Sequence, residues 1–125
     1  MVKMAFPISN HKGLNDHIFE HFGHAPAFLI VEISEDKKVL NIDIIDNIYQ
    51  ETHSPGEVPS LLANKNVKIL ICKGIGRRAI ELFEQSGIKV IKGISGRVKD
   101  VLKEYLSGKL ESKDYWPRQK WSKNR

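Results

Sequence analysis

Five short apolar segments of the chain predict β-strands. They cover residues 2–9, 27–34, 39–46, 67–72 and 88–93. In the first, alternation places Met4, Phe6 and Ile8 on one side, and the third alternates apart from Val39 and Leu40. The second, AFLIVEIS, is an almost continuous apolar run that is typical of a buried strand. The polar EDKK between the second and third segments predicts a hairpin turn.

Three further segments predict helices, at 56–66, 76–87 and 96–108. In the first, Pro59 is tolerated only in the first turn. Glycines close the other two helices, and the last helix gathers its apolar residues on one face. A hairpin followed by alternating helices and strands predicts an α/β layer fold, with the later strands parallel and joined by right-handed crossovers.

Basic residues concentrate at the C-terminal end of the 125-residue chain. From Lys109 to Arg125, six Lys or Arg stand against two acidic residues, while the remainder is nearly neutral. The amphipathic pattern stops at Gly108, so we expect one domain over 1–110 and an extension over 111–125. The extension interleaves aromatic and basic side chains that could stack on bases, pair with an acidic protein or a second copy, or pack on the domain: Tyr115, Trp116, Arg118, Lys120 and Trp121. Nucleic acid is the less expected partner, because the domain offers no matching basic face.

Several functional classes are disfavoured by what the sequence lacks. A single cysteine, Cys72, allows no internal disulfide and no centre held by several cysteines of one chain, and we expect it to be a small buried hydrophobe. No Gly-x-Ser-x-Gly elbow or Walker-type loop is present, and the first strand carries no acidic residue for a two-metal nuclease, so a hydrolase or phosphate-ligand enzyme ranks last. The absence of a long apolar stretch predicts no membrane span and a cytoplasmic location.

Three predicted strands end in turns that suit an anion. The turns SNHKG (9–13), KGIGRR (73–78) and KGISGR (92–97) each combine glycine or small polar residues with a cation. Ligands of open parallel sheets bind beyond the carboxyl ends of the strands, and two of these turns open helices, where backbone N–H groups attract negative charge. The sequence therefore predicts an anion-binding edge.

Three of the five histidines lie together in HIFEHFGHAP. His17, His21 and His24 have the i, i+4, i+7 spacing of one helix face, but the Gly and Pro that follow should end any helix by residue 22, leaving His24 in a loop. Two imidazoles could bind a metal only with additional ligands, and a solvated loop is the simpler alternative. The other side chains that could complete such a site lie in predicted loops: His11, Asp16 and His53.

The chain resembles the dinitrogenase iron-molybdenum cofactor biosynthesis family, the domains akin to NifX and the C-terminal part of NifB. The resemblance rests on HFGHAPAFLIVEI (21–33) and on VKILICKGIGRRAIELFEQSGIKVIKGISGRVKDVLKEYLSGKL (67–110). It implies a three-layer α/β/α fold with a ribonuclease-H-like motif and a mixed five-stranded sheet, made of an N-terminal hairpin plus parallel strands. It also implies non-enzymatic binding, carriage or assembly of an anionic iron–sulfur or molybdenum–iron–sulfur cluster.

The resemblance and the turn chemistry together define the expected site. The expected cofactor-binding residues are His21, Gly74, Gly76, Arg77, Ser95, Gly96 and Arg97. The expected metal ligands are His21, His24 and His53. The sequence has no radical-SAM cysteine motif, so the resemblance does not imply a cofactor synthase. The alternative function is an interaction module that binds nucleic acid or an acidic partner through the basic aromatic tail.

Overall fold

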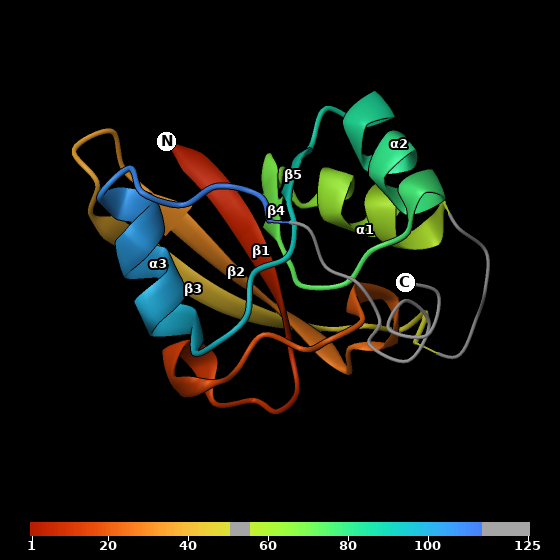
Figure 1. Cartoon of the computed structure of the whole chain (residues 1–125), viewed down its shortest axis with the longest axis horizontal. Helices are drawn as coiled ribbons and strands as arrows, with labels where there is room; N and C mark the ends of the chain where they lie inside the picture. The colour runs from red at the N-terminus through yellow and green to blue at the C-terminus, as the bar shows by residue number, and fades with distance from the viewer. Residues whose placement is uncertain (51–55, 114–125) are drawn as a thin grey trace, which may run out of the picture.

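A mixed five-stranded sheet forms the middle layer of the computed structural model, which describes residues 1–50 and 56–113 (Figure 1). The strands are β1 (Val2–Ile8), β2 (Ala27–Ile33), β3 (Val39–Asp46), β4 (Ile69–Ile71) and β5 (Lys89–Ile91), in the spatial order β3-β2-β1-β4-β5. β2 pairs antiparallel with both β1 and β3, whereas β4 is parallel to β1 and β5 is parallel to β4. The predicted mixed sheet, with its hairpin and parallel later strands, is confirmed.

Helices cover both faces of this sheet (Figure 1). They are α1 (Glu57–Asn64), α2 (Arg77–Gln85) and α3 (Val98–Leu106), and two short 3-10 turns, η1 (Gly13–Asn15) and η2 (Phe22–His24), lie between β1 and β2. α3 packs on one face of the sheet, and α1 with α2 packs on the other. The three helices fall within the predicted segments, and Pro59 lies in the first turn of α1 as expected.

The alternation along β1 explains the two hydrophobic layers. Met4, Phe6 and Ile8 belong to the cluster that includes α3, whereas Ala5 belongs to the cluster on the α1 and α2 side. Every one of these side chains is fully buried, because successive residues of a strand point to opposite faces and both faces are covered. A nearly continuous apolar run in the neighbouring strand β2 has the same cause.

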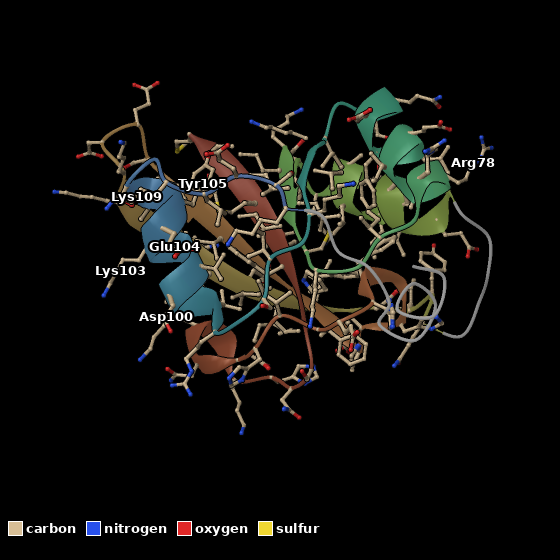
Figure 2. All side chains as sticks on the ribbon, in the orientation of Figure 1. Arg78, Asp100, Lys103, Glu104, Tyr105 and Lys109 are labelled. Carbon is tan, nitrogen blue, oxygen red and sulfur yellow. The ribbon has the colours of Figure 1, made fainter. Side chains whose placement is uncertain are left out.

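The outer side of α3 is polar. Asp100, Lys103 and Glu104 are exposed there, while Tyr105 packs partly against the core (Figure 2). Within the described part of the chain, no helix has both the length and the apolar character needed to cross a membrane.

The topology brings the carboxyl ends of β1, β4 and β5 to one edge of the sheet, since these three strands run in the same direction. The three turns singled out in the sequence follow these strands. That edge is therefore the candidate site.

Candidate functional site at the carboxyl edge of the sheet

The connection between β1 and β2 runs along the carboxyl edge of the sheet. It covers residues 9–26 and is joined to the turn before α3 by two backbone hydrogen bonds. The amide of Ile18 donates to the carbonyl of Gly96 over 2.9 Å, and the amide of Val98 donates to the carbonyl of Asp16 over 2.9 Å. The connection is thereby fixed to the body of the domain rather than looping freely into solvent.

A second pair of hydrogen bonds joins the same connection to the turn after β4. The amide of Gly74 donates to the carbonyl of Glu20 over 2.7 Å, and the amide of Phe22 donates to the carbonyl of Gly74 over 3.2 Å. These bonds form an isolated parallel bridge between His21 and Gly74. The His-Phe-Gly and Gly-Ile-Gly segments, more than 50 residues apart in the sequence, therefore lie side by side.

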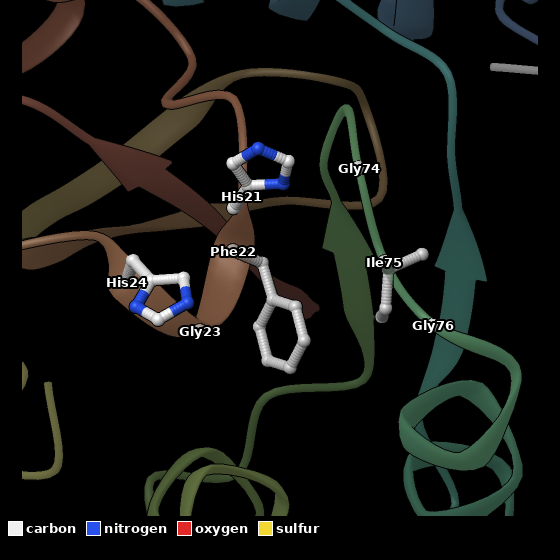
Figure 3. Close-up of a pocket in the computed structure, with 7 residues that line it drawn as sticks. All are labelled: His21, Phe22, Gly23, His24, Gly74, Ile75 and Gly76. Carbon is white, nitrogen blue, oxygen red and sulfur yellow. The ribbon is translucent and has the colours of Figure 1, made fainter. Parts of the chain in front are cut away.

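A hollow of about 370 Å³ lies between these two segments (Figure 3). Its lining residues are His21, Phe22, Gly23, His24, Gly74, Ile75 and Gly76. The wall thus combines two imidazoles, two apolar side chains and the backbone of three glycines. Such a surface offers nitrogen ligands and N–H donors but no carboxylate, so it suits an anionic ligand.

The two imidazoles of the hollow lie near one another. The ring centroids of His21 and His24 are 6.3 Å apart, with the ring planes at 89°. Both residues are exposed, and His24 is the last residue of η2. The i, i+4, i+7 spacing of the three histidines does not produce a helix face, because His17, Ile18 and His21 make β-bridges.

Two side chains that follow β3 support the turn that carries these histidines. The side-chain Nδ2 of the buried Asn47 donates to the carbonyls of Gly23 and Ala25, over 3.2 and 2.9 Å. The side-chain Nε2 of Gln50 donates to the carbonyl of His24 over 3.1 Å. The sequence pattern did not predict this role, although an Asn directly after a strand is a common turn-forming signal.

The N-terminus of α2 closes one end of the hollow. Gly76 is the N-cap, and no side chain caps the helix there. The first-turn N–H groups and the helix dipole therefore place partial positive charge beside the hollow. Arg77, the first residue of α2, is exposed and adds a full positive charge next to Gly76.

The predicted anion-binding turn at 92–97 lies at the same edge but does not line the hollow. Ser95, Gly96 and Arg97 are exposed. The backbone of Arg97 forms an isolated antiparallel β-bridge with that of His17. The predicted residues thus fall into two groups, one at Gly74 and one at Gly96, joined by the β1–β2 connection. His17 belongs to the second group.

Two loop residues considered as further metal ligands have other partners. The Nε2 atom of His11 lies 3.0 Å from Oδ1 of Asp46, at the end of β3. Asp16 is 2 % exposed, and its carboxylate accepts the amides of Asn10 and His17, both over 2.9 Å. Neither side chain lines the hollow.

The third expected metal ligand, His53, lies outside the residues that the structure describes, as do Tyr115 to Trp121 of the basic tail. Within 1–50 and 56–113, no group of three His, Cys, Asp or Glu side chains is arranged to hold a metal ion.

Cys72 is buried in the core on the α1 and α2 side of the sheet, as expected. Burial raises the pKa of its thiol from 9.0 to about 12, and the opposing effect of the Lys92 charge is smaller. Thiolates rather than thiols bind metals and react with electrophiles. The side chain is therefore a packing residue at neutral pH.

This pKa predicts a slow reaction of Cys72 with the disulfide reagent DTNB at pH 8. At pH 8 a thiol with a pKa of about 12 has a thiolate fraction about 1000-fold lower than a thiol with a pKa of 9.0. The folded protein should therefore react at least about 100-fold more slowly than protein in 6 M guanidinium chloride. The raised pKa also makes the free energy of unfolding depend on pH. Its stabilising contribution is complete below pH 9 and is lost as the pH rises from 9 through about 12, and Cys72→Ala should lack this dependence. Equal rates in folded and unfolded protein would contradict the assignment.

Comparisons with known proteins bear on both the fold and the edge. A family model described as dinitrogenase iron-molybdenum cofactor matches residues 2–108. The protein MJ0580 of Methanocaldococcus jannaschii is 36% identical over 113 residues, which are 89% of this chain and 91% of that protein.

Solved structures give the same picture. The crystal structure of PH0822 has a TM-score of 0.80 at 33% identity, covering 93% of this chain and all of its own. TM1290, a Thermotoga protein with a provisional NifB assignment, has a TM-score of 0.74 at 27% identity, covering 95% and 99% of the two chains. The apo orange protein of Desulfovibrio gigas shares the fold, with a TM-score of 0.76 at 23% identity over 90% and 93% of the chains.

Proposed function

Because the chain belongs to the dinitrogenase iron-molybdenum cofactor family, we propose that the hollow between His21 and Gly74 binds an anionic metal–sulfur cluster, which the protein carries or helps to assemble without catalysing a reaction. The cluster is of the iron–sulfur or molybdenum–iron–sulfur class. One observation carries the proposal. The backbone bridge between His21 and Gly74 brings both motif segments of the family resemblance to the walls of a single hollow.

The chemistry of the lining supports an already assembled cluster rather than a single metal ion. A closed site for one ion generally needs three or four protein ligands, whereas the lining of the hollow offers two imidazoles. A cluster whose metals are already coordinated by sulfide is held here by one imidazole and by hydrogen bonds to its anionic surface. In this proposal His21 ligates or hydrogen-bonds the cluster. His24, whose ring centroid lies 6.3 Å from that of His21, provides a second contact. Negative charge on the cluster is offset by the N–H groups at the start of α2 and by Arg77.

The second glycine turn has a supporting role in the proposal. Ser95, Gly96 and Arg97 lie at the same edge, where they add positive potential without lining the hollow. Their substitution should weaken binding less than substitution of His21. Gly76 leaves room for the ligand, because a Cβ atom at this position would meet nothing within 4 Å.

The test is anaerobic loading of the protein with tetrathiomolybdate, or with iron, sulfide and molybdate, followed by desalting, visible absorption and metal analysis. His21→Ala should retain at least about tenfold less metal than the wild type, the effect of losing one strong polar contact. His17→Ala is the matched control, because this exposed histidine lies on the same connection but does not line the hollow. Equally low retention by the wild type and His21→Ala would overturn the proposal.

A further inference from the structure

The outer strand β3 has one side on which its backbone can accept a further strand. Within residues 1–50 and 56–113, the backbone ladder of this eight-residue strand is with β2 only. Alternate N–H and C=O groups of such an edge strand point away from the sheet. The opposite edge is shorter, because β5 has three residues and the chain at Ser112 and Lys113 is hydrogen-bonded to Lys92 next to its end. Of the two edges, β3 therefore offers the longer one.

The exposed side chains of β3 are apolar for much of its length. Val39, Leu40 and Ile42 are 41, 51 and 40 % exposed. Val39 lies opposite Ile33 and Ile42 lies opposite Val31, and both of these partners are buried in the cluster on the α3 side of the sheet. The strand contains no proline and no lysine, two residues that commonly protect a free edge. The apolar layer of the core thus continues to the edge of the sheet.

We propose that β3 pairs with β3 of a second copy of this chain, antiparallel, around a two-fold axis that passes through Ile42. A two-fold interface uses the same surface on both copies and closes the assembly at a dimer. The pairing satisfies the outward backbone groups of both strands and covers the exposed apolar side chains. It does not depend on any ligand in the hollow, so it stands or falls apart from the proposed function.

The side chains of the strand select this register. In an antiparallel ladder, only residues whose backbone groups face the shared edge pair with one another, so a two-fold axis passes through a residue and not between two residues. An axis at Ile42 places Ile42 against its own copy and Asn41 opposite Asp43. An axis at Asp43 would place two carboxylates opposite each other, which is destabilising. An axis at Ile44 would place Asp46 opposite Ile42, with no partner for the charge.

The ends of the strand add charge complementarity. A register shift with β2 passes over Leu40, and Lys37 and Lys38 lie on the far side of this irregularity, before the strand begins. Asp46 is the last residue of β3, and its side chain is 76 % exposed. Antiparallel pairing around Ile42 brings the lysines of each copy towards Asp46 of the other copy. Opposite charges therefore lie near each other at both ends of the interface, which favours a second copy as the occupant.

Sedimentation equilibrium of the full chain tests the dimer. Stable complexes bury about 800 Å² per partner, so pairing through one strand should be weak, and dimers should form as the protein concentration approaches about 1 mM. Ile42→Lys should raise the Kd of the dimer at least about tenfold, because the introduced charge meets its own copy at the axis. Ile48→Lys is the matched control, since this isoleucine is 70 % exposed but lies beyond the strand, and its Kd should be unchanged.

Charge variants at two exposed positions test the register without altering the apolar row. Asn41→Asp places a carboxylate opposite Asp43 on both sides of the axis and should raise the Kd at least about threefold. The double variant N41D/D43N exchanges the two groups and should restore the Kd of the wild type. A Kd that is lowered by Asp43→Asn and unchanged by Asn41→Asp would place the axis at Asp43 and contradict the register.

Two results would overturn the dimer itself. One is a wild-type chain that remains monomeric up to about 1 mM. The other is a dimer that persists unchanged in Ile42→Lys, because the contact would then lie on another surface. Circular dichroism of each variant shows that a changed Kd does not come from unfolding, and the charge variants keep the test decisive if Ile42→Lys proves unstable.

Discussion

Phe83→Ala is expected to lower the free energy of unfolding by about 3–5 kcal/mol, the usual cost of removing a buried aromatic ring. Phe83 is fully buried on α2, in the cluster between this helix and the sheet. Its ring meets that of Phe22 edge to face, with the centroids 5.4 Å apart. Since Phe22 lines the hollow, the substitution should also loosen the wall and weaken ligand binding.

Urea unfolding followed by circular dichroism measures the stability loss, and retention of tetrathiomolybdate measures the effect on the hollow. Phe83→Leu is the control, because leucine fills much of the volume; it should cost less than about half as much. A loss below about 1 kcal/mol for Phe83→Ala would show that the ring does not hold α2 against Phe22.

The elements of this fold follow closely from local sequence patterns. The segment expected to be a helix over 76–87 contains α2, Arg77–Gln85, and the one over 96–108 contains α3, Val98–Leu106. Both predictions use a terminal glycine, and the second also uses an apolar face. Gly87 and Gly108 indeed adopt φ angles of +82° and +77°. These are short-range effects, so the sequence is sufficient to locate them.

The strand ends were less predictable. β4 and β5 have three residues each, whereas the apolar runs predicted six. Residues beyond the paired part, such as Cys72, are buried without extending the ladder. Apolar character reports burial, and strand length is set by which neighbours are available to pair.

The candidate site depended on a long-range arrangement that no local pattern contains. Gly74 and Gly96 were expected at one edge because parallel strands share their carboxyl ends. The path of the β1–β2 connection could not be inferred, since its two attachments are backbone hydrogen bonds that any residue can make. For the same reason the backbone bridge between His17 and Arg97 could not be inferred from the sequence.

The role of Asp16 shows how the same limit affects a titratable residue. From the sequence it was one of several loop side chains that might complete a metal site. In the structure its carboxylate faces inward and accepts the amides of Asn10, Lys12 and His17, over 2.9, 3.3 and 2.9 Å. A buried carboxylate with several backbone donors organises the loop instead of offering its oxygens to a ligand.

Asp16→Ala is therefore expected to lower the free energy of unfolding by about 3 kcal/mol, since a hydrogen bond to a charged group contributes about 1.5–3 kcal/mol and the orphaned amides add a desolvation cost. Asp16→Asn keeps one carbonyl oxygen as an acceptor and should lose roughly half as much. Urea unfolding gives both values. Hydrogen exchange should show the amides of Asn10 and Lys12 losing protection.

The position of Asp16 also separates the two attachments of the β1–β2 connection. Its backbone carbonyl accepts the amide of Val98, so the change should loosen the link to α3. The link between Phe22 and Gly74 uses none of these atoms, and the side chain of Asn47 holds the turn at His24 through the carbonyl of Gly23. Asp16→Ala should thus weaken tetrathiomolybdate binding less than Phe83→Ala does. The reverse order would mean that the connection acts as one cooperative unit, with the hollow depending on both attachments.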